Sequence, residues 1–153
     1  MGWGVRPGKP PDPEEFRKGA RALREFFAAV RERYPIDPER VVLLGFSQGG
    51  AMAYEWALSE PESVAGLVAL STWLPEPLAS AVGKKPEQQE LPVLVLHGTQ
   101  DAMVSVDMAR ASRERLRDFG VRLMYRELEM GHEVSREALE LIVSWLEEKP
   151  GAS

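Results

Sequence analysis

The chain has 153 residues, enough for a substantial hydrophobic core, and we expect a single domain over residues 1–153. Hydrophobic residues make up 44% and charged residues 28%, as in an ordinary globular protein. The formal net charge of -5 gives no electrostatic support for a nucleic-acid partner. The sequence has no cysteine, which excludes disulfides and thiolate metal sites and is consistent with a cytoplasmic location. No apolar run approaches the roughly 20 residues of a membrane span.

The first half of the chain predicts an arm, a helix, a strand and a second helix. Residues 1–11 are rich in Gly and Pro and should form an irregular arm. Apolar residues at alternating three- and four-residue steps predict a helix over 12–34, with Asp12 as its N-cap. The short apolar run Val41–Leu44 is typical of a strand buried on both faces, and a helix should follow over 48–59.

The second half continues the alternation of strands and helices. Residues 75–92 contain four prolines and a polar tract, and are predicted to be a surface excursion. Alternation of this kind indicates a parallel sheet with helices on its faces, and such sheets bind ligands at the carboxyl ends of their strands. The further predicted elements are strands at 64–70, 93–96 and 121–128, the last of them an edge strand, and helices at 106–119 and after a cap at Ser135.

A nucleophile motif follows the first predicted strand. Gly45-Phe46-Ser47-Gln48-Gly49 matches G-x-S-x-G, in which a serine sits on a tight turn between a strand and a helix. Gly45 and Gly49 are expected to let the strand and the helix approach each other. The amide of Gln48 would then point into the site and stabilise an oxyanion. An ordinary glycine-rich turn is the alternative, but the strand before the motif and the helix after it favour the nucleophile.

Partners for Ser47 follow in the order Ser, Asp, His that is typical of α/β-hydrolases. Asp101 comes just after the third predicted strand and His132 just after the fourth, so all three side chains should meet at one edge of the sheet. His132 would accept the serine proton, and Asp101 would orient the imidazole. The rival base is His97, which would break the chain order and suits a structural role better. The rival acid is Asp107, which suits the first turn of its helix better.

Other site assignments are less specific. Trp73 and Leu74 follow the second predicted strand and are candidates for lining a substrate pocket, although ordinary packing explains them equally well. No metal site is expected, because the sequence has two histidines and no His-x-x-x-His pair.

Longer motifs resemble the phospholipase/carboxylesterase family, which includes acyl-protein thioesterases and bacterial carboxylesterases. The resemblance covers roughly residues 36–147 and is most specific in GFSQGGAM and GHEVS. The motifs that carry it lie at 45–52, 68–75, 97–101 and 130–135.

The resemblance implies an α/β-hydrolase that cleaves carboxylic esters, thioesters or lysophospholipids through an acyl-enzyme without a cofactor. It also implies that Ser47, Asp101 and His132 form the catalytic triad and that the Gln48 amide is one oxyanion donor. Another reaction on the same fold, such as dienelactone-type or peptide hydrolysis, is a minor alternative. The serine at position 47 disfavours the dienelactone type, which normally uses cysteine there.

The sequence departs from the family in two places. Asp101 is followed by Ala-Met-Val-Ser rather than by a segment such as Pro-Val-Val-Pro. In addition, the usual N-terminal strands with an HG-type loop, which supplies the second oxyanion amide, are not evident before Ser47. The only Gly-bearing candidate there is Gly2-Trp3-Gly4. Loss of one oxyanion donor costs roughly 2.7–4 kcal/mol, so a truncated or degenerate hydrolase that acts as a binding module is the alternative function.

The missing strands would leave the apolar strand 41–44 at an open edge of the sheet, where it would be an aggregation template. Three features could cover that edge: a part of the protein upstream of residue 1, the helix 12–34, or a second copy of the chain. We predict a homodimer that covers the edge of strand 41–44.

Overall fold

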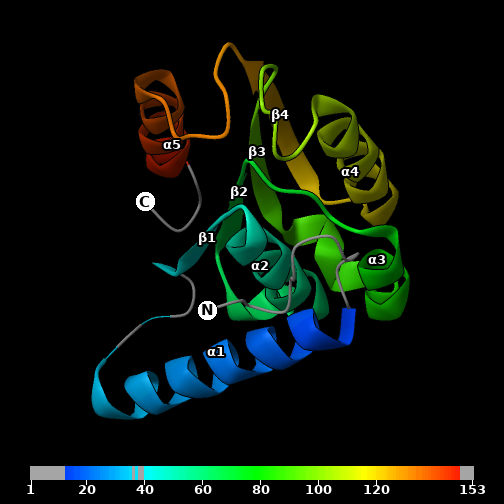
Figure 1. Ribbon diagram of the computed structural model, residues 1–153. Coiled ribbons are helices and arrows are strands. Elements are labelled where there is room, and N and C mark those ends of the chain that lie inside the picture. Colours follow the sequence, from blue (N-terminus) through cyan, green and yellow to red (C-terminus); the bar gives the residue numbers. More distant parts are fainter. Residues whose placement is uncertain (1–12, 36, 38–39, 149–153) are drawn as a thin grey trace.

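A four-stranded parallel sheet organises the molecule, with its strands in the order β1-β2-β3-β4 (Figure 1). The computed structural model describes residues 13–35, 37 and 40–148. In chain order the elements are α1 (Pro13–Arg33), β1 (Val42–Phe46), α2 (Gln48–Ser59), β2 (Gly66–Leu70), α3 (Glu76–Val82), β3 (Pro92–Gly98), α4 (Val106–Phe119), β4 (Arg122–Leu128) and α5 (Arg136–Glu148), with short 3-10 helices at Pro61–Ser63 and Pro86–Glu90. This arrangement confirms the predicted α/β class.

Burial along the strands explains their places in the sheet. Every residue of β2 and β3 is buried, as in strands covered on both faces. In β4 exposed and half-buried residues alternate, which confirms the predicted edge strand. The other edge is β1, where Leu44 is 55% exposed and Phe46 is 37% exposed. The prediction that this strand is buried on both faces is therefore wrong, because it lies at the edge of the sheet.

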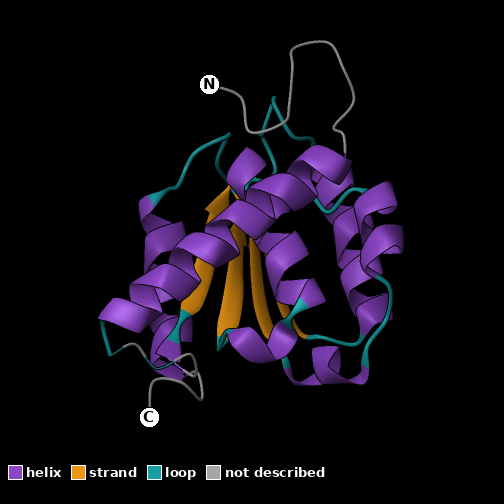
Figure 2. Ribbon diagram, turned by 90° about the horizontal axis from the view of Figure 1, so that it is seen from below, coloured by secondary structure: helices purple, strands orange, loops and turns teal. Residues whose placement is uncertain are grey.

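Helices cover the two faces of the sheet unequally (Figure 2). On one face, Leu67 and Val95 belong to a core that also contains buried residues of α2, α3 and α4. On the other face, Leu70 and Leu96 pack with Trp145 and other residues of α5. Alternate residues of each strand pack on opposite faces of the sheet, because successive side chains in a strand point to opposite sides.

Helix α1 packs against α2 and leaves the β1 edge uncovered within the described part of the chain. Ala20 is fully buried there, and Leu23 packs against the same core. Glu55 of α2 is also buried, and its carboxylate accepts hydrogen bonds from Arg24 at 2.8 Å and from Ser59 at 2.8 Å. A buried carboxylate without such donors would be costly, so this ion pair ties α1 to α2.

Two predicted helix signals are confirmed. Gly120 ends α4 in a left-handed conformation with φ 81°, and its amide donates to the carbonyl of Arg117. The hydroxyl of Ser135 accepts a hydrogen bond from the amide of Ala138 at the start of α5. The predicted cap Asp12 and the arm 1–11 lie outside the described residues.

The prediction for residues 75–92 is wrong in part, because this segment contains α3 and a 3-10 helix rather than a plain surface excursion. Leu78 and Gln88 are fully buried. The Gln88 side chain bonds to the amide of Lys85 and to the carbonyl of Leu58. Prolines at the starts of these helices are compatible with the first turn, where the missing N–H has no partner to lose. No helix in the described part of the chain is long and apolar enough to cross a membrane.

Candidate active site

Ser47 lies on a strained turn between β1 and α2. It has φ 56° and ψ -125°, a conformation that residues other than glycine rarely adopt and that costs of order 1–3 kcal/mol. A Cβ built on Gly45 would lie 2.5 Å from the Cα of Gly50 and 2.7 Å from the carbonyl oxygen of Gly49. The strand and the helix can therefore meet this closely only because Gly45 carries no side chain.

Gly50, and not Gly49, is the second glycine that close packing around this turn requires. The expectation that Gly49 lets the strand and the helix approach each other is therefore wrong. A Cβ on Gly49 would meet nothing within 4 Å, whereas a Cβ on Gly50 would overlap the side chain of Thr72. The difference arises because Gly49 lines an open hollow at the surface, while Gly50 faces the segment that leaves β2.

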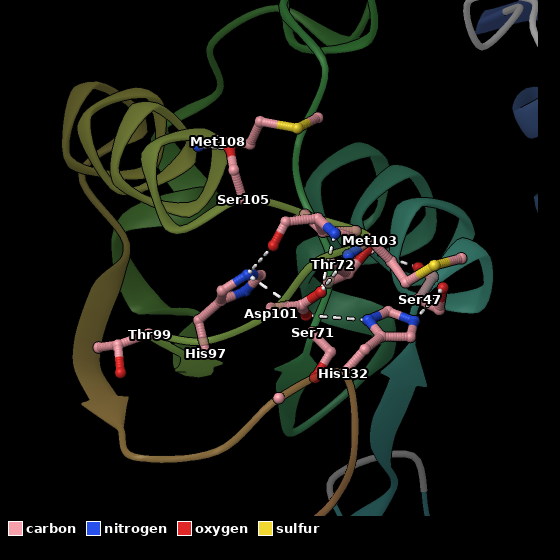
Figure 3. Close-up of polar contacts among 12 residues, drawn as sticks. Ser47, Ser71, Thr72, His97, Thr99, Asp101, Met103, Ser105, Met108 and His132 are labelled. Atoms are coloured by element: carbon pink, nitrogen blue, oxygen red, sulfur yellow. Dashed lines mark hydrogen bonds and ion pairs between the residues drawn. The ribbon is translucent and has the colours of Figure 1, made fainter.

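The side chains of Ser47, His132 and Asp101 form a continuous hydrogen-bonded row (Figure 3). His132 Nε2 lies 3.1 Å from Ser47 Oγ, and His132 Nδ1 lies 2.9 Å from Asp101 Oδ2. The carboxylate accepts a hydrogen bond from Nδ1–H, which leaves Nε2 without a proton and able to accept the proton of the serine hydroxyl. The His132 side chain is 18% exposed, so solvent can reach the base. The side chain of its hydrogen-bond partner Asp101 is fully buried.

Asp101 is held in its ionised form by hydrogen bonds from its own loop. Burial by itself would raise the pKa of this carboxyl group, but bonds from the amide of Val104, from His132 and from the amide of Met103 outweigh it and lower the pKa. Oδ1 accepts both amide bonds at 2.8 Å, and Oδ2 remains for His132. The loop residues after Asp101 differ from the family pattern, yet the carboxylate stays well bonded, because this loop supplies its donors through backbone amides and not through side chains.

The loops that carry Asp101 and His132 are tied to each other. The amide of Thr99 donates to the carbonyl of Leu128 at 2.9 Å, and the amide of Gln100 donates to the carbonyl of Met130 at 3.1 Å. A Cβ on Gly98 would overlap the carbonyl oxygen of Met130, so this contact requires glycine. The bonds continue the pairing of β3 and β4 past the ends of the strands.

The rival base and the rival acid both lie away from the Ser47 hydroxyl. His97 is fully buried, and its Nε2 lies 2.7 Å from the carbonyl oxygen of Val104. Asp107 is in the first turn of α4, as expected, where it faces Arg110 at 3.7 Å. Ser105 rather than Asp107 caps α4, because its hydroxyl accepts the amide of Met108.

A hollow beside Ser47 is lined mainly by apolar side chains and by the first residues of α2. Trp73 and Leu74, the expected pocket residues, do not line it. Leu74 is fully buried in the core, with its amide bonded to Ser112, so for Leu74 the pocket expectation is wrong and the packing alternative holds. The lining residues are Leu23, Phe46, Ser47, Gln48, Gly49 and Met52.

Two features of the site have no signal in the sequence. The ring of Phe46 lies against the His132 imidazole, with the ring centroids 4.9 Å apart. The hydroxyl of Thr72 donates to the carbonyl oxygen of Ser47 at 2.6 Å. Each contact joins residues far apart in the chain, so only the folded arrangement reveals it.

Gln48 is the first residue of α2, so its amide has no acceptor within the helix and is available to an oxyanion. The arm Gly2–Gly4, considered for a second donor, lies outside the described residues. Among the residues that are described, no group of three or more His, Asp or Glu side chains is placed to hold a metal ion.

Comparisons with known proteins agree with this fold. Carboxylesterase SOBER1 of Arabidopsis thaliana is 33% identical over 115 residues, which are 74% of this chain and 50% of that protein. Acyl-protein thioesterase 1 of Mycosarcoma maydis is 34% identical over 105 residues, which are 69% of this chain and 44% of that protein. The crystal structure of SOBER1 superposes with a TM-score of 0.79 at 27% identity, over 94% of this chain and 69% of that one.

The chain spans about half the length of the curated relatives it matches. A family model described as Phospholipase/Carboxylesterase matches residues 4–149, which is nearly the whole chain. Together with relatives above 30% identity and the shared fold, this match shows that the chain belongs to the phospholipase/carboxylesterase family.

Proposed function

We propose that this chain is a serine hydrolase that cleaves carboxylic esters through an acyl-enzyme on Ser47. The observation that carries the proposal is the hydrogen-bonded row from Ser47 Oγ through His132 to the buried carboxylate of Asp101. The names of the relatives, carboxylesterase and acyl-protein thioesterase, support acyl transfer from an oxygen or a sulfur leaving group.

The proposed reaction has two halves. Ser47 Oγ attacks the ester carbonyl carbon as its proton moves to His132 Nε2, and the oxyanion that forms is stabilised by the Gln48 amide. The ester bond then breaks, and the leaving alcohol takes the proton from His132. In the second half, water gives a proton to His132 and attacks the acyl-enzyme. The acid is released as Ser47 recovers its proton. Asp101 stays ionised throughout and stabilises the imidazolium.

Hydrolysis of p-nitrophenyl acetate, butyrate and octanoate tests the proposal, with Ser47→Ala as the matched control. We expect Ser47→Ala to lower kcat by at least about 10³-fold while the circular dichroism spectrum stays unchanged. Hydrolysis equal in the two proteins would contradict the assignment of Ser47. No hydrolysis in a folded sample would favour the alternative, a degenerate hydrolase that binds without turnover. A matched octanoyl thioester distinguishes ester from thioester preference.

We propose in addition that two copies of the chain associate through β1. The exposed Leu44 supports the proposal, and so does the outer backbone of β1, which pairs with no strand among the described residues. Pairing with a second β1 around a two-fold axis would satisfy that backbone. Sedimentation equilibrium should give a dimer that Leu44→Lys converts to a monomer. Met124→Lys, on the opposite edge strand, should leave the dimer intact. A monomeric wild type would overturn the proposal.

A further inference from the structure

Thr72 makes a contact with the nucleophile that the proposed reaction does not use. It is the second residue after the end of β2, and 2% of the residue is exposed. Its hydroxyl donates to the carbonyl oxygen of Ser47 at 2.6 Å, a short bond directed at the strained turn (Figure 3). The side chain fits only because Gly50 has no Cβ, so the sequence of the turn and the residue at position 72 suit each other.

The same bond determines the direction of the neighbouring amide. The carbonyl of Ser47 and the N–H of Gln48 belong to one planar trans peptide group, so the two point in opposite directions. Fixing the carbonyl on the buried Thr72 hydroxyl therefore directs the Gln48 N–H the other way. A hydrogen bond to the carbonyl also polarises the peptide group and makes its N–H a stronger donor.

Two hydrogen bonds tie Ser47 to β2 and to the segment that follows it. The amide of Ser47 donates to the carbonyl of Leu70 at 3.1 Å, and the carbonyl of Ser47 accepts a hydrogen bond from the hydroxyl of Thr72. The amide of Gly50 also donates to the Ser47 carbonyl at 3.0 Å, as the first helical bond of α2. A backbone conformation in a sparsely populated region persists only when its surroundings determine it from several sides.

We propose that Thr72 is a positioning residue, whose hydroxyl fixes the plane of the Ser47–Gln48 peptide and so aims the oxyanion donor. The inference rests on the proposed function, because an oxyanion donor matters only if Ser47 forms an acyl-enzyme. Thr72 itself does not touch the reacting atoms.

Two matched variants isolate the hydroxyl. Thr72→Val removes it and keeps the shape that fills the space against Gly50, whereas Thr72→Ser keeps it. Complete loss of an oxyanion donor costs ~10²–10³ in kcat. Because the Gly50 bond still holds the carbonyl, we expect Thr72→Val to lower kcat about tenfold, less than that full loss. KM should stay within about twofold, because the donor acts mainly in the transition state. Thr72→Ser should restore most of the rate.

A pair of substrates separates positioning from general damage to the fold. Sulfur accepts hydrogen bonds more weakly than oxygen, so the rate ratio between an oxo ester and its thiono analogue, with C=S in place of C=O, reports on donation to the oxyanion. In Thr72→Val this ratio should fall by about the factor lost in kcat. A purely structural effect would lower both rates equally. Rates are expressed per active site, counted by titration with a phosphonate inhibitor.

The outcomes are distinct. Thr72→Val with the kcat and the oxo-to-thiono ratio of the wild type would overturn the inference and leave the proposed function standing. A wild type without Ser47-dependent hydrolysis would overturn the proposed function, and the inference would fall with it. If Thr72→Val does not fold, Thr72→Ala is measured per titrated site, and the same results decide.

Discussion

On one side of the candidate site Ser47 lies on a strained turn, and on the other side Asp101 and His132 lie on two loops that hydrogen-bond to each other. The turn depends on close packing, because a side chain at position 45 or 50 would overlap neighbouring atoms. The loops depend on hydrogen bonds, which backbone amides donate to carbonyls and to the Asp101 carboxylate.

The two sides should therefore be sensitive to different kinds of substitution. Steric crowding is steep in distance, so an added methyl group should damage the turn most. Hydrogen bonds fail when a donor or an acceptor is lost, so an isosteric change of chemistry should damage the loops most.

The largest effect should come from Asp101→Asn, which keeps the shape of the side chain and removes its charge. The amide cannot stabilise the imidazolium and favours the wrong tautomer of His132, so kcat should fall by ~10⁴-fold. Steady-state hydrolysis of p-nitrophenyl butyrate measures this change. Asp107→Asn, in the exposed first turn of α4, is the matched control and should hydrolyse at the wild-type rate. Equal losses in the two variants would contradict the assignment of the acid.

The turn should break under Gly45→Ala. The new Cβ would lie 2.5 Å from the backbone of Gly50, and overpacking of this kind costs about 1–3 kcal/mol or more in the free energy of unfolding. Chemical denaturation measures the loss. Gly49→Ala, four residues along the same turn, meets nothing within 4 Å and should be neutral or stabilising by up to about 1 kcal/mol. If Gly49→Ala lowered the free energy of unfolding more than Gly45→Ala did, the packing described for this turn would be refuted.

Much of the arrangement could be predicted from the sequence, because its signals are local. Continuous apolar runs mark β2 and β3, and alternation marks the edge strand β4. Knowing that parallel strands end at one edge was enough to expect Ser47, Asp101 and His132 near one another. The structure brings their side chains within hydrogen-bond distance, and their catalytic roles stay a prediction.

The parts that could not be predicted depend on contacts between distant segments. The spacing G-x-S-x-G does not say that Gly50, outside the motif, is the glycine pressed against Thr72. Leu74 was a candidate for the substrate pocket because it follows a strand. In the structure it is buried, and its amide donates to the hydroxyl of Ser112 in α4. Prolines in 75–92 suggested irregular chain, although proline is compatible with the first turn of a helix.

A smaller effect should appear in the pH dependence of stability. The folded-state pKa of Asp101 is lowered, so its contribution to stability is present above the ordinary carboxyl pKa of about 4 and is lost as pH falls through the folded value. The free energy of unfolding of the wild type should therefore exceed that of Asp101→Asn at pH 7, and the gap should narrow towards pH 3. Urea titrations across this range measure the gap. If the difference in the free energy of unfolding widened on acidification, the lowered pKa of Asp101 in the folded state would be contradicted.

The smallest effect should come from the contact that joins the two sides. Phe46 ends β1, and its ring lies 4.9 Å from the His132 imidazole between centroids, so it links the turn to the base. Aromatic pairs contribute about 0.5–1.5 kcal/mol beyond area burial, which corresponds to roughly a two- to twelvefold change in rate if the contact orients the imidazole. Phe46→Leu should lower kcat/KM within that range, whereas Phe26→Leu, on a side chain 69% exposed, should not. An unchanged kcat/KM in Phe46→Leu would show that the loops alone orient His132, and the two sides of the site would then be mechanically independent.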